Sequence, residues 1–184
     1  MARNRAHQKP KEVIESFINS SPVNAVTLLI MSINSFLNNE IKITVDQDPP
    51  QTSLLFMGVH ASILTISEIL FNEKGEKGYK RFLKEFIDEG TGDRCFSQIA
   101  GEIHSWRNIL VHGWLSLRGH NIEYEYKMQK GFEKRGETLY INPRVYLALY
   151  LSAFQEGQIL KYVSKMAPEE LSRAQETIRR KYLR

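Results

Sequence analysis

The sequence predicts a mainly α-helical fold, an antiparallel up-and-down helical bundle with one inserted β-hairpin. Apolar residues recur at intervals of three and four through most of the 184-residue chain, as in helices that pack on a core. Serine, asparagine, proline and glycine stand at the ends of these periodic segments. One segment, after residue 120, instead alternates polar and apolar residues, which is the period of a strand.

Three helices are predicted in the first part of the chain. Residues 1–9 are expected to be a basic disordered tail, followed by a single helical domain over residues 10–184. Ser21-Pro22 places a capping residue before a proline, which is a strong helix start signal. The segment after Asp48-Pro49-Pro50 is apolar nearly all round, as a central buried helix would be. The helices are expected over residues 10–20, 22 to about 39, and 52 or 53 to about 72.

The second part of the chain is expected to hold four more helices and the hairpin. Gly75 and Gly78 are expected to bound a loop. In the hairpin, Ile122, Tyr124, Tyr126 and Met128 are expected to pair with Leu139 and Ile141 across a long polar tip. The helices are expected over residues 79–88, 93–112 and 143–163, with a basic C-terminal helix over about 168–184, and the hairpin over about 121–142.

Composition favours a cytoplasmic globular protein. A hydrophobic content of 42% and a charged content of 25% are ordinary for such a protein. The single cysteine, Cys95, cannot form an internal disulfide, which fits a reducing compartment. The first eleven residues contain no apolar core of a secretory signal. Residues 54–71 are apolar but include His60 and Glu68, so neither a membrane span nor a membrane partner is expected.

Positive charge is concentrated at the two ends of the chain. Residues 1–11 contain four basic and no acidic residues, and residues 173–184 contain five basic residues and one acidic residue. Basic ends suit contact with a nucleic-acid backbone. Charge runs are also common on solvated surfaces, where they serve only solubility, and both interpretations stay open.

The strongest functional signal is the segment Trp106-Arg107-Asn108-Ile109-Leu110-Val111-His112-Gly113-Trp114. At about 100° per residue, Asn108 lies about 100° and His112 about 140° from Arg107, with His104 near 60°. Together an arginine, an amide and a histidine can bind a phosphate and move a proton. The opposite arc carries an apolar stripe that would face the core: Phe96, Ile99, Ile103, Trp106, Leu110 and Trp114.

A structural explanation of the same residues is an ordinary helix end. Arg107 would then pair with a carboxylate, Asn108 would bond locally, and His112 would lie near the helix C-terminus, where a cation is favoured. Small residues on the polar side would let another backbone approach closely. These are Ser97, Ala100, Gly101 and Ser105.

Late in a bundle helix, Arg107 is followed directly by Asn108 and, after a gap of four residues counted from Arg107, by His112, which resembles the signature of the HEPN superfamily. The architectural similarity covers about residues 10–165. The resemblance implies a metal-independent endoribonuclease, a toxin or defence effector, that works as a homodimer with the motif at the dimer cleft. Arg107 would bind the scissile phosphate, His112 would act as general acid or base, and Asn108 would orient one of them or the phosphate.

The resemblance also sets expectations for partners. RNA and a second copy of the chain are expected, with an antitoxin or a nucleotidyltransferase as further candidates, and no metal or other cofactor is needed. In one HEPN subgroup, a tyrosine two residues after the histidine is modified with AMP. Trp114 stands there in this chain and has no hydroxyl, so regulation by that route is not expected.

Two further residues are candidates for supporting roles. Glu68, in the most apolar helix, needs a partner and would either hold Arg107 or form a salt bridge elsewhere. His104 would touch RNA or a partner helix, and His60 is expected to be a core histidine. The alternative functions are a non-catalytic HEPN-like module that binds RNA, a nucleotide or a partner protein, and a plain helical interaction protein.

Overall fold

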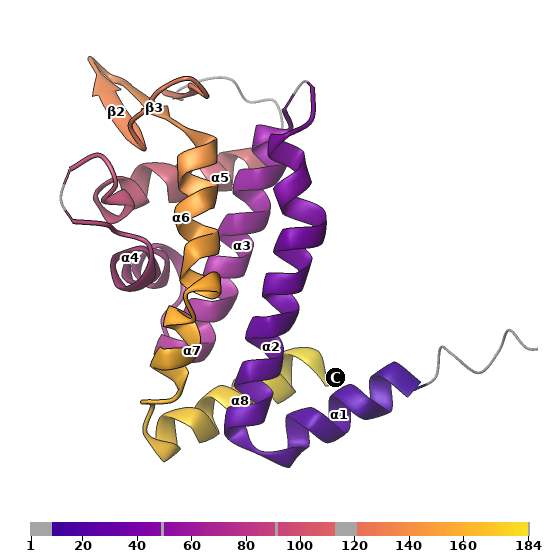
Figure 1. Cartoon of the computed structure of the whole chain (residues 1–184). Coiled ribbons are helices and arrows are strands. Elements are labelled where there is room, and N and C mark those ends of the chain that lie inside the picture. Colours follow the sequence, from indigo (N-terminus) through magenta and orange to yellow (C-terminus); the bar gives the residue numbers. More distant parts are fainter. Residues whose placement is uncertain (1–8, 49, 91, 113–120, 184) are drawn as a thin grey trace, which may run out of the picture.

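A computed structural model describes residues 9–48, 50–90, 92–112 and 121–183 (Figure 1). Side chains are described within these ranges except at 9–11, 13 and 110–112. The predicted N-terminal tail lies almost wholly outside the described residues. Trp114 also lies outside them.

The described residues form a mainly helical fold with one small sheet. The α-helices are α1 (Lys9–Ser20), α2 (Pro22–Phe36), α3 (Thr52–Phe71), α4 (Gly75–Phe86), α5 (Ala100–His112), α6 (Pro143–Gln155), α7 (Gln158–Val163) and α8 (Pro168–Tyr182). The π- and 3-10 helical turns are η1 (Leu37–Ile41), η2 (Lys42–Val45) and η3 (Phe96–Ile99), and the strands are β1 (Ile122–Tyr124), β2 (Phe132–Arg135) and β3 (Thr138–Ile141).

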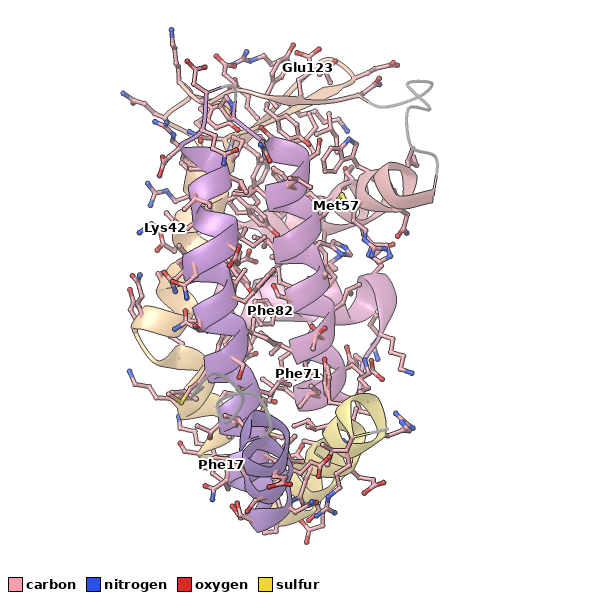
Figure 2. The ribbon with its side chains drawn as sticks, turned by 90° about the vertical axis from the view of Figure 1, so that its right-hand side faces the viewer. Phe17, Lys42, Met57, Phe71, Phe82 and Glu123 are labelled. Carbon is pink, nitrogen blue, oxygen red and sulfur yellow. The ribbon has the colours of Figure 1, made fainter. Side chains whose placement is uncertain are left out.

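Three long helices, α2, α3 and α6, form the body of the molecule (Figure 1). α1 and α8 cross one end of this body, and the small sheet lies at the other end. α4 and α5 pack on α3 and on each other, and they run across α3 rather than along it. Figure 2 shows that they lie on the side of α3 away from α2. The predicted bundle is therefore helical as expected, but its motif-bearing helix is not part of a simple up-and-down arrangement.

α3 is the central helix, as its sequence predicts. It contacts α2, α4, α5, α6 and α8, and most of its residues are buried. By length and composition alone it could cross a membrane, but 61% of its most apolar window is buried inside the bundle. Its apolar surface is therefore largely covered by the other helices, and burial of such surface is the main force that holds a helical bundle together.

The sequence signals at helix starts act as predicted. Ser21 accepts a hydrogen bond from the backbone N–H of Asn24 at 3.1 Å, with Pro22 in the first turn of α2. Asn142 accepts one from the backbone N–H of Arg144 at 2.9 Å at the start of α6. These caps satisfy backbone donors that the first turn of a helix leaves free.

The sheet differs from the predicted hairpin. Ile122 pairs with Leu139 and Tyr124 with Ile141, but β1 and β3 run parallel. β2 forms an antiparallel hairpin with β3, and the strand order is β1-β3-β2. The segment expected to be a polar tip therefore contains a strand, and its Phe132 ring packs on Phe96 at 5.5 Å. Tyr126 and Met128, also expected to pair, lie after the end of β1 and outside any strand. Alternation therefore identified only part of the strand residues, and it contains no information on strand direction.

Glycines explain two other differences. Gly75 and Gly78, expected to bound a loop, lie in α4, and a Cβ on Gly78 would come within 2.5 Å of the Glu73 carbonyl oxygen. Gly78 therefore permits close packing against the turn after α3, where Ser67 Oγ donates to the Gly78 carbonyl at 2.9 Å. Gly157, with a φ of 67°, interrupts the single helix expected over 143–163 and separates α6 from α7.

Candidate functional site

η3 and α5 together present the predicted apolar stripe to the core, for the residues whose side chains are described. Phe96, Ile99, Ile103 and Trp106 are all buried. The Trp106 ring meets the rings of Phe56 and Tyr124 edge-on, each with centroids 5.5 Å apart. This packing fixes the rotation of α5 and leaves Arg107 and Asn108 partly buried on another side of the helix.

Arg107 and Asn108 are joined to each other. Arg107 Nη1 donates to Asn108 Oδ1 at 3.1 Å, and Arg107 Nε is buried without a hydrogen-bond partner. A guanidinium has five N–H donors, so this pairing leaves donors for a ligand. The backbone of His112 lies in the last turn of α5, and its side chain lies outside the described residues.

A histidine pair lies beside this arginine. His60, in the middle of α3, is completely buried, and its Nε2 is hydrogen-bonded to His104 Nδ1 of α5 at 3.0 Å. The Tyr79 ring of α4 stacks on His60 with centroids 4.4 Å apart, and the Tyr79 hydroxyl bonds that of Tyr146 at 2.7 Å. We call His60, His104, Arg107 and Asn108 the Arg107 cluster.

Both histidines of this cluster favour the neutral form. Burial, and to a smaller extent His104 and the positive charge of Arg107, together lower the pKa of His60 to about 3. Burial also lowers the pKa of His104, and Arg107 adds to this, whereas Glu76 acts in the opposite direction. The Arg107 cluster therefore combines one permanent cation with two uncharged imidazoles near neutral pH.

The sequence suggested the histidines only in part. His60 is a core histidine and His104 lies near Arg107, both as expected, but the contact between His60 and His104 was not anticipated. The sequence did contain one signal for this contact. A fully buried imidazole needs a polar partner, and His104 lies close to the motif on another helix with an apolar face.

Glu68 does not hold Arg107, which corrects one expectation. Its carboxylate lies 3.2 Å from Lys74 Nζ and 3.8 Å from Arg180 Nη2, and it also binds Lys181. Burial would raise the pKa of Glu68, but hydrogen bonds from Lys181 and Lys74 outweigh it and hold this pKa below its usual value. The salt-bridge alternative is therefore the observed one, and we call Glu68, Lys74, Arg180 and Lys181 the Glu68 cluster.

Basic residues of α8 also fix this helix to the body. Arg173 Nη2 donates to the Leu70 carbonyl at 3.0 Å, and Arg179 Nε donates to Asn19 Oδ1 at 3.0 Å. Part of the C-terminal positive charge is therefore used inside the fold.

The small residues of α5 mostly face their own chain. Ser97 Oγ donates to Asp88 Oδ2 at 2.5 Å, and a Cβ on Gly101 would come within 3.1 Å of Glu76 Oε1. Ala100 is buried, whereas Ser105 is exposed. The helix that packs closely against these small residues is therefore largely α4 of the same chain.

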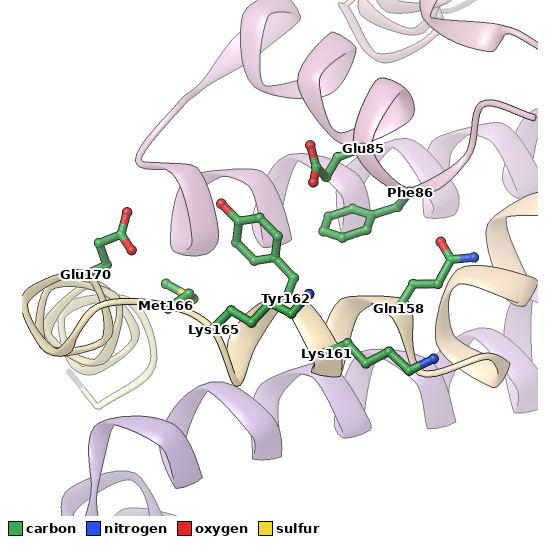
Figure 3. Close-up of a pocket in the computed structure, with 8 residues that line it drawn as sticks. All are labelled: Glu85, Phe86, Gln158, Lys161, Tyr162, Lys165, Met166 and Glu170. Carbon is green, nitrogen blue, oxygen red and sulfur yellow. The ribbon is translucent and has the colours of Figure 1, made fainter.

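Several hollows surround these elements. A cleft of about 430 Å³ between α5 and the sheet is lined by Ser105, Ile109 and Lys134 among others. A second cleft of about 430 Å³, with Glu85, Lys161, Lys165 and Glu170 around Tyr162, lies between α4, α7 and α8 (Figure 3). An apolar groove of about 640 Å³ lies between α2 and α3, with Met57 on the face seen in Figure 2. The first of these adjoins α5, but none of the residues that line these three hollows belongs to the Arg107 cluster.

No metal-binding group among the described residues and no known relative assigns a function to the site. The described residues contain no group of three or more His, Cys, Asp or Glu that could hold a metal ion. Comparisons of the chain with protein-family models, with curated proteins and with solved structures gave no match.

Proposed function

We propose that the chain is a metal-independent endoribonuclease of HEPN type, in which Arg107, Asn108 and His112 form the site and two copies of the chain meet at it. The observation that most supports this proposal is the set of contacts that Arg107 makes. If the motif only ended a helix, a carboxylate partner would be expected. Within the described residues Arg107 bonds an amide, has a buried Nε without a partner, and lies within ion-pair distance of no carboxylate.

The proposed reaction is transesterification of an RNA phosphodiester. The 2′-oxygen bonds to phosphorus as its proton passes to a base, the bond from phosphorus to the 5′-oxygen breaks, and that oxygen takes a proton from an acid. The products are a 2′,3′-cyclic phosphate and a 5′-hydroxyl. His112 serves as base or acid, and Arg107 stabilises the charge that develops on the phosphate oxygens.

The test is cleavage of RNA by the purified full chain in the presence of a chelator. We expect products with cyclic phosphate ends, and a loss of about 10²-fold or more in rate for Arg107→Ala and for His112→Ala. Arg94→Ala is the matched control, because Arg94 is half exposed and pairs with Glu89 at 2.9 Å. Absence of cleavage of tRNA, mRNA and structured RNA would reject the proposal, as would cleavage that survives both substitutions.

A second candidate function is a HEPN-like module that binds RNA, a nucleotide or a partner protein without turnover. The bond from Arg107 to Asn108 favours it, because it occupies one donor of the guanidinium before any ligand arrives. The enzyme should be toxic when expressed in a bacterial host, and His112→Ala should relieve the toxicity. The module should bind RNA without cutting it and show no such toxicity.

The proposed dimer has its own test. Light scattering on the full chain after size-exclusion chromatography should give twice the chain mass of 21.4 kDa. A mass of one chain at the concentrations used for the cleavage assay would remove the second copy from the proposal and require that a single chain hold the whole site.

A further inference from the structure

The histidine pair is an unusual feature of the Arg107 cluster, because neither nitrogen of His60 reaches solvent. His60 is completely buried in α3, Tyr79 covers one face of its ring, and its Nε2 bonds His104 Nδ1 at 3.0 Å. Its other nitrogen, Nδ1, is buried without a partner. The ring of His104 is only partly buried, and His104 Nε2 is not among the buried atoms that lack a partner.

This arrangement decides which nitrogens carry protons. A neutral imidazole has one N–H donor and one acceptor nitrogen, and the bond between the two rings needs one proton. A proton on His60 Nδ1 would be a buried N–H without an acceptor, and orphaned buried donors are rarer than under-satisfied acceptors. His60 therefore carries its proton on Nε2 and donates it to His104 Nδ1. His104 must then carry its own proton on Nε2, at the accessible edge of the ring.

The electrostatic surroundings keep this state neutral. His104 faces Arg107 on α5, His60 on α3, and Glu76 and Tyr79 on α4. Burial and the charge of Arg107 disfavour a second proton on either ring, although Glu76 opposes this at His104. His104 thus presents a single N–H donor of fixed position.

That donor lies next to the proposed phosphate ligand. His104 precedes Arg107 by three residues on α5, and side chains at this spacing are neighbours on a helix surface, with about 5–6 Å between their Cβ atoms. We infer that His104, oriented by the buried His60, is a further RNA-binding residue of the site and donates its Nε2–H to an oxygen of the phosphodiester bound by Arg107. The inference depends on the RNA-binding part of the proposed function.

In this arrangement Arg107, His104 and His60 have different roles. Arg107 supplies the charge, and His104 supplies a directed hydrogen bond that would strengthen as negative charge builds on the phosphate oxygen. A neutral imidazole is suited to this because it donates without exchanging protons, as in enzymes that use an uncharged histidine as an electrophile. His60 is a positioning residue, because it acts only through the tautomer and orientation of His104.

Nitrogen-15 NMR of the full chain tests the inference without requiring cleavage. Long-range imidazole spectra should show His104 with its proton on Nε2. On addition of a single-stranded RNA oligonucleotide with 2′-deoxy substitutions, which cannot form a cyclic phosphate, the His104 Nε2 signal should shift. His104→Phe should weaken binding by about tenfold, and His104→Gln, which keeps a donor, should restore part of it.

Four outcomes are distinguishable. Binding without a shift at His104, or a free protein with the His104 proton on Nδ1, overturns the inference and leaves the proposed function intact. Binding with the shift, but no cleavage of unmodified RNA, supports the inference and rejects the ribonuclease. Absence of any binding rejects both. In His60→Phe, we expect the His104 tautomer preference to be lost, and a preserved preference would show that His60 does not set it.

Discussion

Two polar clusters lie along the same central helix, and they differ in how completely their atoms are paired. At the end of α3, the Glu68 carboxylate meets three basic side chains, one from the turn before α4 and two from α8. In the middle of α3, the Arg107 cluster leaves His60 Nδ1 and Arg107 Nε buried without partners. One cluster is satisfied within the chain, and the other keeps hydrogen-bonding capacity that the chain does not use.

The difference supports the proposal that the Glu68 cluster is structural and the Arg107 cluster functional. Buried polar groups in folded proteins are nearly always paired, so each exception needs an explanation. The Glu68 cluster needs none, because its ion pairs join α3 to α8 and to the turn before α4. Three other buried atoms without a partner lie elsewhere among the described residues, at Glu73, Tyr124 and Arg173, so such atoms support a ligand site at the Arg107 cluster but are not confined to it.

The largest effect is expected for catalysis at the Arg107 cluster. Arg107→Ala should lower the rate of RNA cleavage by about 10²–10³-fold, since it removes the charge that stabilises the transition state. Glu68→Ala should leave this rate within about twofold of the wild type when both are assayed at a temperature where each is folded. Equal losses in the two variants would show that Arg107 acts through stability alone.

For stability, the larger loss is expected in the Glu68 variant and the smaller one in the Arg107 variant. Glu68→Ala should lower the free energy of unfolding by about 1–3 kcal/mol, because three cations, on α8 and in the turn between α3 and α4, lose their counter-ion. The expected loss of stability is modest because Lys74 and Arg180 are largely exposed, with side-chain exposures of 71% and 55%. Urea unfolding followed by circular dichroism measures it. Arg107→Ala should cost less than about 1 kcal/mol, and a larger loss there than at Glu68 would contradict the comparison.

Acid should weaken the fold through the histidine pair. The folded-state pKa values of His60 and His104 lie below the ordinary 6.5, so below about pH 6.5 the unfolded chain binds more protons. Stability is therefore complete above that pH and falls as pH decreases toward 5, by at most about 1.4 kcal/mol per pH unit for each histidine. Urea midpoints at pH 7, 6 and 5 give the slope. His60→Phe should flatten it, and an unchanged slope would exclude His60 as the source.

The smallest effect is expected at Asn108. Asn108→Ala removes the acceptor of the Arg107 bond and should change the free energy of unfolding by about 1 kcal/mol or less. Cleavage should fall by roughly tenfold, because Arg107 loses a positioning contact. Asn108→Asp retains an acceptor but adds a negative charge beside the phosphate, so it should be slower than Asn108→Ala. A faster Asn108→Asp would argue against a phosphate at this position.

The helices could be predicted from the sequence because their signals are local. Ser21-Pro22, Asn142-Pro143 and Pro168 begin helices where expected. The apolar stripe of η3 and α5 is correctly assigned at Phe96, Ile99, Ile103 and Trp106. Each of these inferences depends on the spacing of neighbouring residues, which the backbone geometry fixes.

What could not be predicted depends on contacts between distant segments. The direction of β1 against β3, and the place of Gly78 in α4 against the end of α3, follow from tertiary packing. The same holds in the site. The sequence identified Glu68 as a carboxylate that needs a partner and His60 as a core residue, but the partners Lys181 and His104 come from other helices. Helical spacing gives the face of a residue, but not which helix covers that face.

The most direct test of the central claim is the affinity of the full chain for a non-cleavable single-stranded RNA, measured as a function of salt. If the Arg107 cluster binds phosphate, Arg107→Ala should weaken binding by at least about tenfold and reduce the slope of log K against log salt by about 0.7, the value for one phosphate contact on a single strand. Glu68→Gln should change neither quantity. An affinity and a salt slope unchanged in Arg107→Ala would contradict the claim.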